Sequence, residues 1–277
     1  MRRKLIALSI FILSATPALS TPVTIGSWNL RQLGWKNGKD IDAVARVARH
    51  MDVLALQEVM TVEALEDLEL ALEEKSGEDW DFLASEAIGR GSYKERYAFI
   101  WRKSALDWLD GAAVYTDDRD VFAREPMSMR FETSDGYRFV LASVHLIYGK
   151  NVAQRQAEAT ALHGYMDWLV ANAGGSPVLL AGDFNLPPDD KAWSGVASVA
   201  TPLFTSGATT LSPVNDRYVN LYDNIWVSGF EGLPVTGSGI LDFPDLLRVD
   251  HEAARDYVSD HAPVWVTIDP DPEIGGF

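Results

Sequence analysis

The sequence contains no cysteine and has a clear deficit of basic side chains. Without cysteine no disulfide can form, so a packed core must stabilise the chain, and a composition that is 47% hydrophobic with nine tryptophans makes such a core feasible. Lysine and arginine number 24 against 40 aspartates and glutamates, which gives a formal net charge of −16. An acidic surface repels phosphate polymers at long range, so any binding of nucleic acid must be local or assisted by cations.

Linker-like tracts and internal repeats are also missing, which favours a single domain over residues 21–270. At the start of the chain a basic segment, an apolar run and small residues follow one another, an order typical of a secretory signal peptide over residues 1–20. The apolar run is too short to span a bilayer comfortably, which disfavours a permanent anchor. We therefore expect cleavage near Ser20 and a secreted or periplasmic monomer without stable membrane association. Residues 271–277 are typical of a C-terminal tail.

Strand and helix patterns alternate along the chain. Short apolar stretches predict strands at residues 23–30, 53–59, 96–102, 177–185, 220–227 and 261–268. Apolar side chains at helical spacing predict helices at residues 40–52, 61–77 and 151–175. Residues 127–146 are predicted to form two strands joined around Asp135 and Gly136. Hairpins combined with strand-helix-strand units indicate a mixed sheet in a layered α/β or α+β domain.

Polar side chains stand at the ends of the apolar strands. They are Asn29, Glu58, His145, Asp183 with Asn185, Asp223, and Asp260 with His261. A carboxylate buried at such a place is costly unless a metal ion or a hydrogen-bond partner compensates it. Taken singly, each aspartate is more often a turn residue and each histidine more often structural. Their recurrence within one domain leads us to expect that they converge.

The sequence "GDFN" places two of these groups in one motif. Asp183 and Asn185 are two residues apart, so on an extended strand their side chains share a face. One can then orient a water molecule while the other holds a phosphate or metal oxygen.

A local cationic, tyrosine-containing segment interrupts this acidic chain at residues 89–102. Its sequence, "GRGSYKERYAFIWR", contains four basic side chains and a single acid, Glu95. It also contains Tyr93.

These motifs resemble a known family. The sequences "WNL", "QEV", "GDFN" and "SDH", in this order across residues 27–267, resemble the endonuclease/exonuclease/phosphatase superfamily, which also includes phosphoinositide phosphatases and sphingomyelinases. Residues 85–102 and "FAREP" resemble its deoxyribonuclease I branch. The resemblance implies a four-layer α/β sandwich of two packed mixed β-sheets flanked by helices, with the site at the top of the sheets. It also implies that residues 89–102 face the DNA backbone and minor groove.

The resemblance implies two kinds of metal site. A shell for Mg²⁺ or Mn²⁺, made of hard oxygen ligands and water, would consist of Asn29, Glu58 and Asp260. A structural Ca²⁺ loop would draw on an acidic segment consisting of Asp117, Asp118, Asp120 and Glu125. An ordinary acidic turn is an equally good interpretation of that second segment.

Two histidine-carboxylate pairs would carry the proton transfers. The resemblance makes His261 the general base on water, oriented by Asp223. It places His145, supported by Glu95, on the side of the leaving oxygen. A carboxylate partner fixes the tautomer of an imidazole and favours its protonated form, as both roles require.

The remaining implied roles concern the phosphate and the DNA. Asp183 and Asn185 would position water and stabilise charge in the transition state. Arg31 and Arg124 would contact phosphate, and Tyr93 the groove and sugar. For Arg31 a solvated loop position is an equally good interpretation.

The sequence departs from the family pattern at three places. Met60 replaces an arginine that enters the minor groove, the structural disulfides are absent, and residues 145–149, "HLIYG", replace a stretch that usually contains serine and proline. The function implied is that of a secreted, divalent-metal-dependent endonuclease that cuts DNA with low sequence specificity and leaves 5′-phosphates. Two alternatives remain: a phosphatase or lipid phosphodiesterase of the same fold, and a catalytically silent binding protein.

Overall fold

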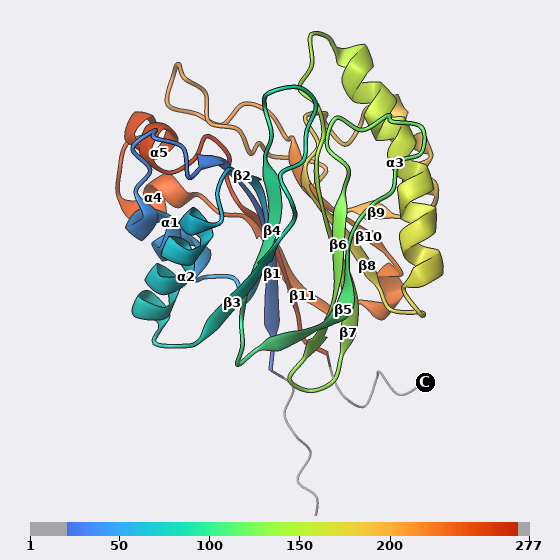
Figure 1. Cartoon of the computed structure of the whole chain (residues 1–277), viewed down its shortest axis with the longest axis horizontal. Helices are drawn as coiled ribbons and strands as arrows, with labels where there is room; N and C mark the ends of the chain where they lie inside the picture. Colours follow the sequence, from blue (N-terminus) through green and yellow to red (C-terminus); the bar gives the residue numbers. More distant parts are fainter. Residues whose placement is uncertain (1–20, 271–277) are drawn as a thin grey trace, which may run out of the picture.

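The computed structural model describes residues 21–270, so the predicted signal peptide and C-terminal tail lie outside the described residues. Two β-sheets pack face to face, with four helices on the outer face of one sheet and one long helix on the outer face of the other (Figure 1). Residues 21–270 contain no helix long and apolar enough to cross a membrane. The predicted fold class, a four-layer sandwich of two mixed sheets flanked by helices, is confirmed.

The first sheet has a single parallel pair near its centre. Its six strands, in spatial order, are β11 (Val235–Ile240), β12 (Val264–Ile268), β1 (Val23–Leu33), β2 (Val53–Val59), β4 (Arg96–Arg102) and β3 (Trp80–Ala84). Strands β1 and β2 are parallel and all other neighbours are antiparallel. Helix α1 (Ile41–Ala48) makes the crossover between them, as a parallel connection requires.

The second sheet repeats this arrangement. In spatial order its strands are β5 (Leu106–Val114), β6 (Met127–Thr133), β7 (Arg138–His145), β8 (Val178–Asp183), β10 (Asp223–Ser228) and β9 (Thr201–Pro202). Strands β7 and β8 form its only parallel pair, and helix α3 (Val152–Asn172) connects them. The carboxyl ends of a parallel pair lie at one edge of a sheet, so each sheet presents two strand ends at such an edge.

Side-chain caps fix where several helices begin. Asp40 accepts a hydrogen bond from the Ala43 amide at the start of α1, and Asn151 accepts one from the Gln154 amide at the start of α3. Helix α2 (Glu63–Ser76) ends at a left-handed glycine. The remaining helical segments are α4 (Phe243–Leu247), α5 (His251–Tyr257) and the short 3-10 turns Lys191–Ser194, Val196–Ser198 and Phe230–Gly232.

Three apolar clusters hold the four layers together. The central cluster lies between the sheets, where Phe131 meets Phe99 and Trp101 edge to face at 6.0 and 5.7 Å between ring centroids. The other two lie between a sheet and its covering helices. Polar contacts also cross between the sheets: the Gln57 side-chain amide, for example, donates to the Ser143 hydroxyl at 2.9 Å.

Gly182 allows the closest approach between β7 and β8. It pairs with Val144 and has a φ of +148°, and a Cβ atom built on it would lie 1.9 Å from the Val144 carbonyl oxygen. The obstacle is backbone within a paired strand, so it cannot move aside as a flexible side chain would. This glycine is therefore needed for the strand that ends at Asp183.

We predict that Gly182→Ala lowers the free energy of unfolding by on the order of 3 kcal/mol, because it forces an overlap with the β7 backbone. The matched control is Gly164→Ala on the exposed side of α3, where an added Cβ would meet nothing within 4 Å. That variant should gain about 0.5 to 1 kcal/mol from helix propensity. Urea denaturation measures both, and equal effects of the two substitutions would contradict the predicted overlap.

Candidate active site

The ends of four strands meet where the two sheets adjoin. Asn29 lies on β1, Glu58 on β2, and His145 and Asp183 end β7 and β8. The Asn29 side-chain amide donates to Glu58 Oε1 at 3.1 Å and to Asp183 Oδ2 at 3.0 Å. One carboxamide from the first sheet thus joins carboxylates from both sheets, and the expected convergence of these four residues is present.

The first histidine-carboxylate pair lies on the β7 side. His145 is buried, and its Nδ1 lies 2.7 Å from Glu95 Oε1, in a hydrogen bond that the imidazole donates. Its Nε2 lies 3.5 Å from Asp183 Oδ2 and 3.9 Å from Glu58 Oε1. The bond to Glu95 therefore orients the other ring nitrogen toward the shared carboxylates.

The second pair has the same design on the opposite side. His261 precedes β12, and its Nδ1 lies 2.8 Å from Asp223 Oδ2. Asp223 begins β10 and pairs in register with Asp183 across the sheet. His261 Nε2 lies 3.6 Å from Asp183 Oδ2, so both imidazoles direct Nε2 at the same carboxylate oxygen.

The carboxylates control the charge of both histidines. Burial alone would lower the pKa of His261, but Asp223 and Asp183 outweigh it and raise that pKa well above 6.5. Burial and the Arg124 charge both lower the pKa of His145, yet Glu95 and Asp183 leave it above 6.5. Without a further cation, both imidazoles are therefore more readily protonated than a free histidine.

Asp183 shows the complementary shift. Burial alone would raise its pKa, but His261 and His145, followed by a hydrogen bond from the Asn185 amide at 2.9 Å, hold it below its usual range. The Asn185 carboxamide itself donates to the Leu146 carbonyl at 2.8 Å. Asp183 is thus an ionised carboxylate with a fixed orientation between two imidazoles.

The backbone is strained at three predicted site residues. Glu58, Asn185 and Arg31 have φ values of 56°, 49° and 43°, in the left-handed region that favours glycine. Asparagine tolerates this conformation, but for glutamate and arginine it costs roughly 1 kcal/mol or more. The strain at Glu58 turns its side chain away from the regular strand alternation and toward Asn29.

Arg124 is a support rather than an exposed cation. Its side chain is 10% exposed, and its guanidinium donates to the carbonyl oxygens of His145 and Leu146 at 2.9 and 3.0 Å, with Glu95 at 3.6 Å. These contacts fix the end of β7, on which His145 stands. A contact of Arg124 with phosphate stays a prediction.

Glu158 is a supporting residue that the sequence analysis missed. From the buried face of α3 its carboxylate accepts hydrogen bonds at 2.6 Å from the amides of Ala123, directly before Arg124, and Ile147, two residues after His145. Its position in the helix could have indicated that it is buried, because Glu158 lies in the same apolar stripe of α3 as Leu162.

The predicted metal residues separate into two groups. Glu58 and Asn29 touch each other, whereas Asp260 Oδ2 accepts a hydrogen bond from Arg255 at 3.0 Å and lies 3.8 Å from Arg31 Nε. Arg31 also donates to the Arg255 carbonyl and pairs with Asp256 at 3.3 Å. The role of Asp260 as a metal ligand stays a prediction.

A second possible metal position lies around His261 and two neighbouring aspartates. Within residues 21–270, one group of three or more acidic or histidine side chains could hold a metal ion, and it consists of Asp183, Asp223 and His261, whose ligand atoms lie within 4.8 Å of one another. Asp223 Oδ1 is buried and has no hydrogen-bond partner. Such oxygen-rich surroundings fit a divalent cation such as Mg²⁺ or Mn²⁺.

The cationic segment is only partly at the site. Tyr93 reaches it, with its hydroxyl 3.5 Å from Glu58 Oε2 and its ring edge to face with Trp35 at 5.8 Å. Arg102, at the far end of β4, forms ion pairs with Asp52 at 3.0 Å and Glu78 at 2.5 Å. Glu95, the acid of the same segment, is the carboxylate that binds His145 at 2.7 Å. Contact with DNA along the whole segment stays a prediction.

The acidic segment predicted to bind Ca²⁺ is closed by internal hydrogen bonds. The Asp117 carboxylate accepts hydrogen bonds from the backbone amides of Arg119, Val121 and Phe122. Asp120 forms an ion pair with Arg90 at 2.8 Å. Ca²⁺ binding by this segment, including Asp118 and Glu125, stays a prediction.

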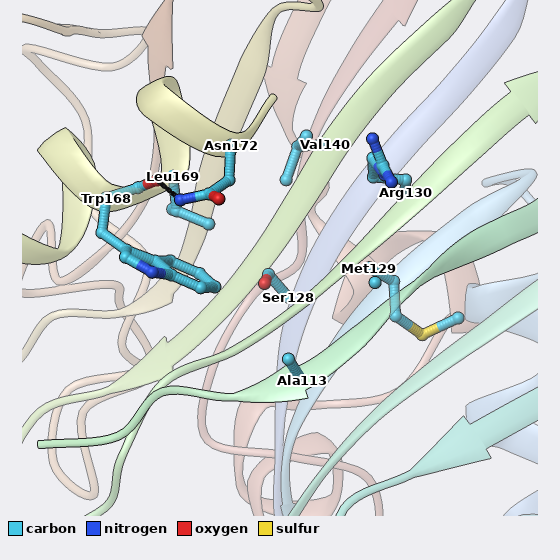
Figure 2. Close-up of a pocket in the computed structure, with 9 residues that line it drawn as sticks. Ala113, Ser128, Met129, Arg130, Val140, Trp168, Leu169 and Asn172 are labelled. Atoms are coloured by element: carbon cyan, nitrogen blue, oxygen red, sulfur yellow. Dashed lines mark hydrogen bonds between the residues drawn. The ribbon is translucent and has the colours of Figure 1, made fainter. Parts of the chain in front are cut away.

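A separate cavity of about 270 Å³ lies between α3 and the outer face of the second sheet (Figure 2). Figure 2 shows the Asn172 side chain bonded to the Trp168 carbonyl, at 2.7 Å, rather than directed at a ligand. Arg130 is paired with Asp110 at 2.5 Å. Asn172 and Arg130 are thus engaged within the protein, whereas the histidine-carboxylate pairs lie at the strand ends.

The raised pKa of His261 predicts how stability depends on pH. Its favourable charge interactions are fully present below pH 6.5, the ordinary pKa, and are lost as the pH rises through the raised folded value. In EDTA, as the pH rises above 6.5, the wild type should therefore lose more stability than His261→Gln. The difference should be about 1.4 kcal/mol for each unit by which the pKa is raised. Urea denaturation measures it, and identical pH profiles would refute the charged pair.

Comparison with known proteins identifies the family of the chain. Residues 26–261 match the Endonuclease/Exonuclease/phosphatase family. The chain is 45% identical to a protein named deoxyribonuclease from Thioalkalivibrio sp. (strain K90mix), over 97% of this chain and 77% of the relative. It is 29% identical to deoxyribonuclease-1 of Oryctolagus cuniculus, over 88% of this chain and 92% of the relative.

Solved structures share the fold. An endonuclease/exonuclease/phosphatase family protein from Bacteroides thetaiotaomicron superposes with a TM-score of 0.66 at 18% identity, covering 90% of this chain and 98% of the other. A mannosyl-6-phosphatase from the same organism superposes with a TM-score of 0.65 at 18% identity, covering 89% and 99%. The chain therefore belongs to the endonuclease/exonuclease/phosphatase family and is a hydrolytic phosphodiesterase similar to proteins named deoxyribonuclease.

Proposed function

We propose that the chain is a secreted, divalent-metal-dependent endonuclease that hydrolyses DNA phosphodiester bonds with low sequence specificity and leaves 5′-phosphate ends. The observation that carries the proposal is the pair of carboxylate-bound histidines whose Nε2 atoms lie 3.5 and 3.6 Å from one oxygen of Asp183. Two proton-transfer groups on opposite sides of one point suit a reaction in which water attacks and an alcohol leaves. The relatives named deoxyribonuclease support DNA as the substrate.

In this proposal His261 is the general base, as the family resemblance implies. Its Nδ1–H is held by Asp223 at 2.8 Å, so in the neutral imidazole Nε2 is the atom that accepts a proton from water. Asp183 lies between the two Nε2 atoms and orients that water by accepting a hydrogen bond from it. As the water oxygen bonds to phosphorus, the proton passes to Nε2, and the negative Asp223 stabilises the imidazolium that forms.

In this proposal His145 is the general acid on the side of the leaving oxygen, as the family resemblance implies. Its Nδ1–H is held by Glu95, and its protonated Nε2 donates to the departing 3′ oxygen as the bond from phosphorus to that oxygen breaks. The phosphate then stays on the 5′ side of the cut. Mg²⁺ or Mn²⁺ held by Glu58 and Asn29, with Asp260 as a further ligand, would neutralise charge on the phosphate.

Low sequence specificity follows from the kind of contact available. Arg31 lies near Asp260 and Tyr93 near Glu58, and their side chains are suited to contact phosphate and sugar. Such contacts do not distinguish one base from another. Secretion is supported by the order of basic, apolar and small residues over residues 1–20. That property is independent of the catalytic assignment.

The test is cleavage of supercoiled plasmid by purified protein with Mg²⁺ or EDTA, beside RNA, sphingomyelin and inositol phosphates. We expect Mg²⁺-dependent nicking to products that a ligase reseals without a kinase, which reports 5′-phosphates. His145→Ala and His261→Ala should each reduce the rate by about 100-fold or more, since each removes one proton transfer.

The matched control is His163→Ala on the surface of α3, where the imidazole lies 3.5 Å from Asp167 and away from the strand ends. It should cut at the wild-type rate. Preferential hydrolysis of a lipid or inositol phosphate would replace DNA as the substrate. Near-normal cutting by a folded His145→Ala or His261→Ala variant would remove that histidine from the mechanism.

A further inference from the structure

Tyr148 exposes an aromatic ring beside the candidate active site. It lies in the connection from β7 to α3, three residues after His145, and is 60% exposed. A single exposed aromatic side chain is ordinary on a protein surface. Tyr148 differs from such a residue because Arg155, which contacts the active-site segments, fixes its ring.

Arg155 fixes the ring from one side. Its guanidinium carbon lies 4.3 Å from the centre of the Tyr148 ring, and its Nε donates to the Tyr148 carbonyl at 2.8 Å. The stacked guanidinium gains a cation-π interaction and covers one ring face. With this cation in place Tyr148 is still 60% exposed, so Arg155 leaves much of the side chain open to a ligand.

The same arginine connects the ring to the catalytic groups. Its NH1 donates to the Asn185 carbonyl at 3.2 Å and to the Tyr222 hydroxyl at 3.3 Å. Asn185 binds Asp183 through its amide, and Tyr222 immediately precedes Asp223. Tyr148 is thus linked through one side chain to the segments that carry both carboxylates facing His261.

The loop that carries the ring is itself held in place. The Leu146 carbonyl accepts hydrogen bonds from Asn185 and Arg124, and the Ile147 amide donates to Glu158 at 2.6 Å. The Lys150 amide donates to the Gln154 side chain at 2.7 Å. A ring that is ordered before the ligand arrives loses little entropy on binding.

We propose that the exposed face of Tyr148 stacks an unpaired nucleobase of the DNA strand that is being cut. The proposal rests on the proposed deoxyribonuclease function and names single-stranded or locally unpaired DNA as a substrate class. Every base has a π-face that can stack on tyrosine, but in a duplex that face is already covered by neighbouring base pairs. Lys150, exposed two residues away, adds a positive charge for the phosphates of the same strand.

The experiment uses a single-stranded oligonucleotide that has one cleavable phosphodiester linkage among phosphorothioates. Two further oligonucleotides each carry one abasic residue, the first on the 5′ side of that linkage and the second on its 3′ side. Tyr148→Ala should lower kcat/KM on the intact single strand by about 10-fold or more, mainly through KM. Tyr148→Phe keeps the ring and should restore the wild-type value. Trp108→Ala is the control and should have no effect, because Trp108 is another exposed aromatic, 42% exposed, on β5 opposite Phe131 of β6.

Two comparisons decide between stacking and other roles. On one abasic oligonucleotide, wild type and Tyr148→Ala should have the same kcat/KM, because the base that the ring contacts is already missing. On a fully paired duplex, Tyr148→Ala should change the rate by less than about 3-fold, since paired bases cannot reach the ring. The proposal would be overturned if Tyr148→Ala lowered kcat/KM on both abasic oligonucleotides by the same factor as on the intact single strand. It would also be overturned if the substitution lowered the rate equally on duplex and on single-stranded DNA. Failure of the wild type to cut any DNA would instead refute the proposed function.

Discussion

The active site depends on one buried negative charge, the carboxylate of Asp183. A buried carboxylate is unfavourable unless its lone pairs and charge are matched. Here a carboxamide from the first sheet, the backbone amide of Asn185 and two protonatable imidazoles compensate it. These partners come from both sheets, so the arrangement exists only when the sheets pack with the ends of β1, β2, β7 and β8 together.

The sequence was most informative where one segment determines its own structure. The apolar runs at residues 53–59 and 96–102 became β2 and β4 with the predicted bounds, and the hairpin around Asp135 became β6 and β7. Strands β5 and β11 were missed because they lie at sheet edges and contain glycine and exposed polar residues instead of a clear alternation. Helices α4 and α5, with five and seven residues, are too short for a periodic signal.

The site could be predicted only in part, for a physical reason. Strand-end polar residues are visible in a sequence, and motif resemblance supplied the pairing of His145 with Glu95, which are 50 residues apart. The residues that support the catalytic groups are not visible in the sequence. The hydrogen bond from the Ala123 amide to Glu158 and the stacking of Arg155 on Tyr148 both depend on three-dimensional packing. The sequence also does not reveal which arginines are free to bind phosphate. In the structure Arg31, Arg90 and Arg102 form ion pairs with carboxylates of the protein.

The left-handed backbone at Glu58 has a consequence for protein engineering. Glycine would relax that conformation, so a screen that rewards heat tolerance alone would favour it there, with a gain of about 1 kcal/mol from the backbone. The same change would delete the carboxylate that Asn29 holds at the edge of the site. Libraries designed to increase thermal tolerance should therefore leave position 58 unchanged and search the outer helices, where stability and chemistry do not compete.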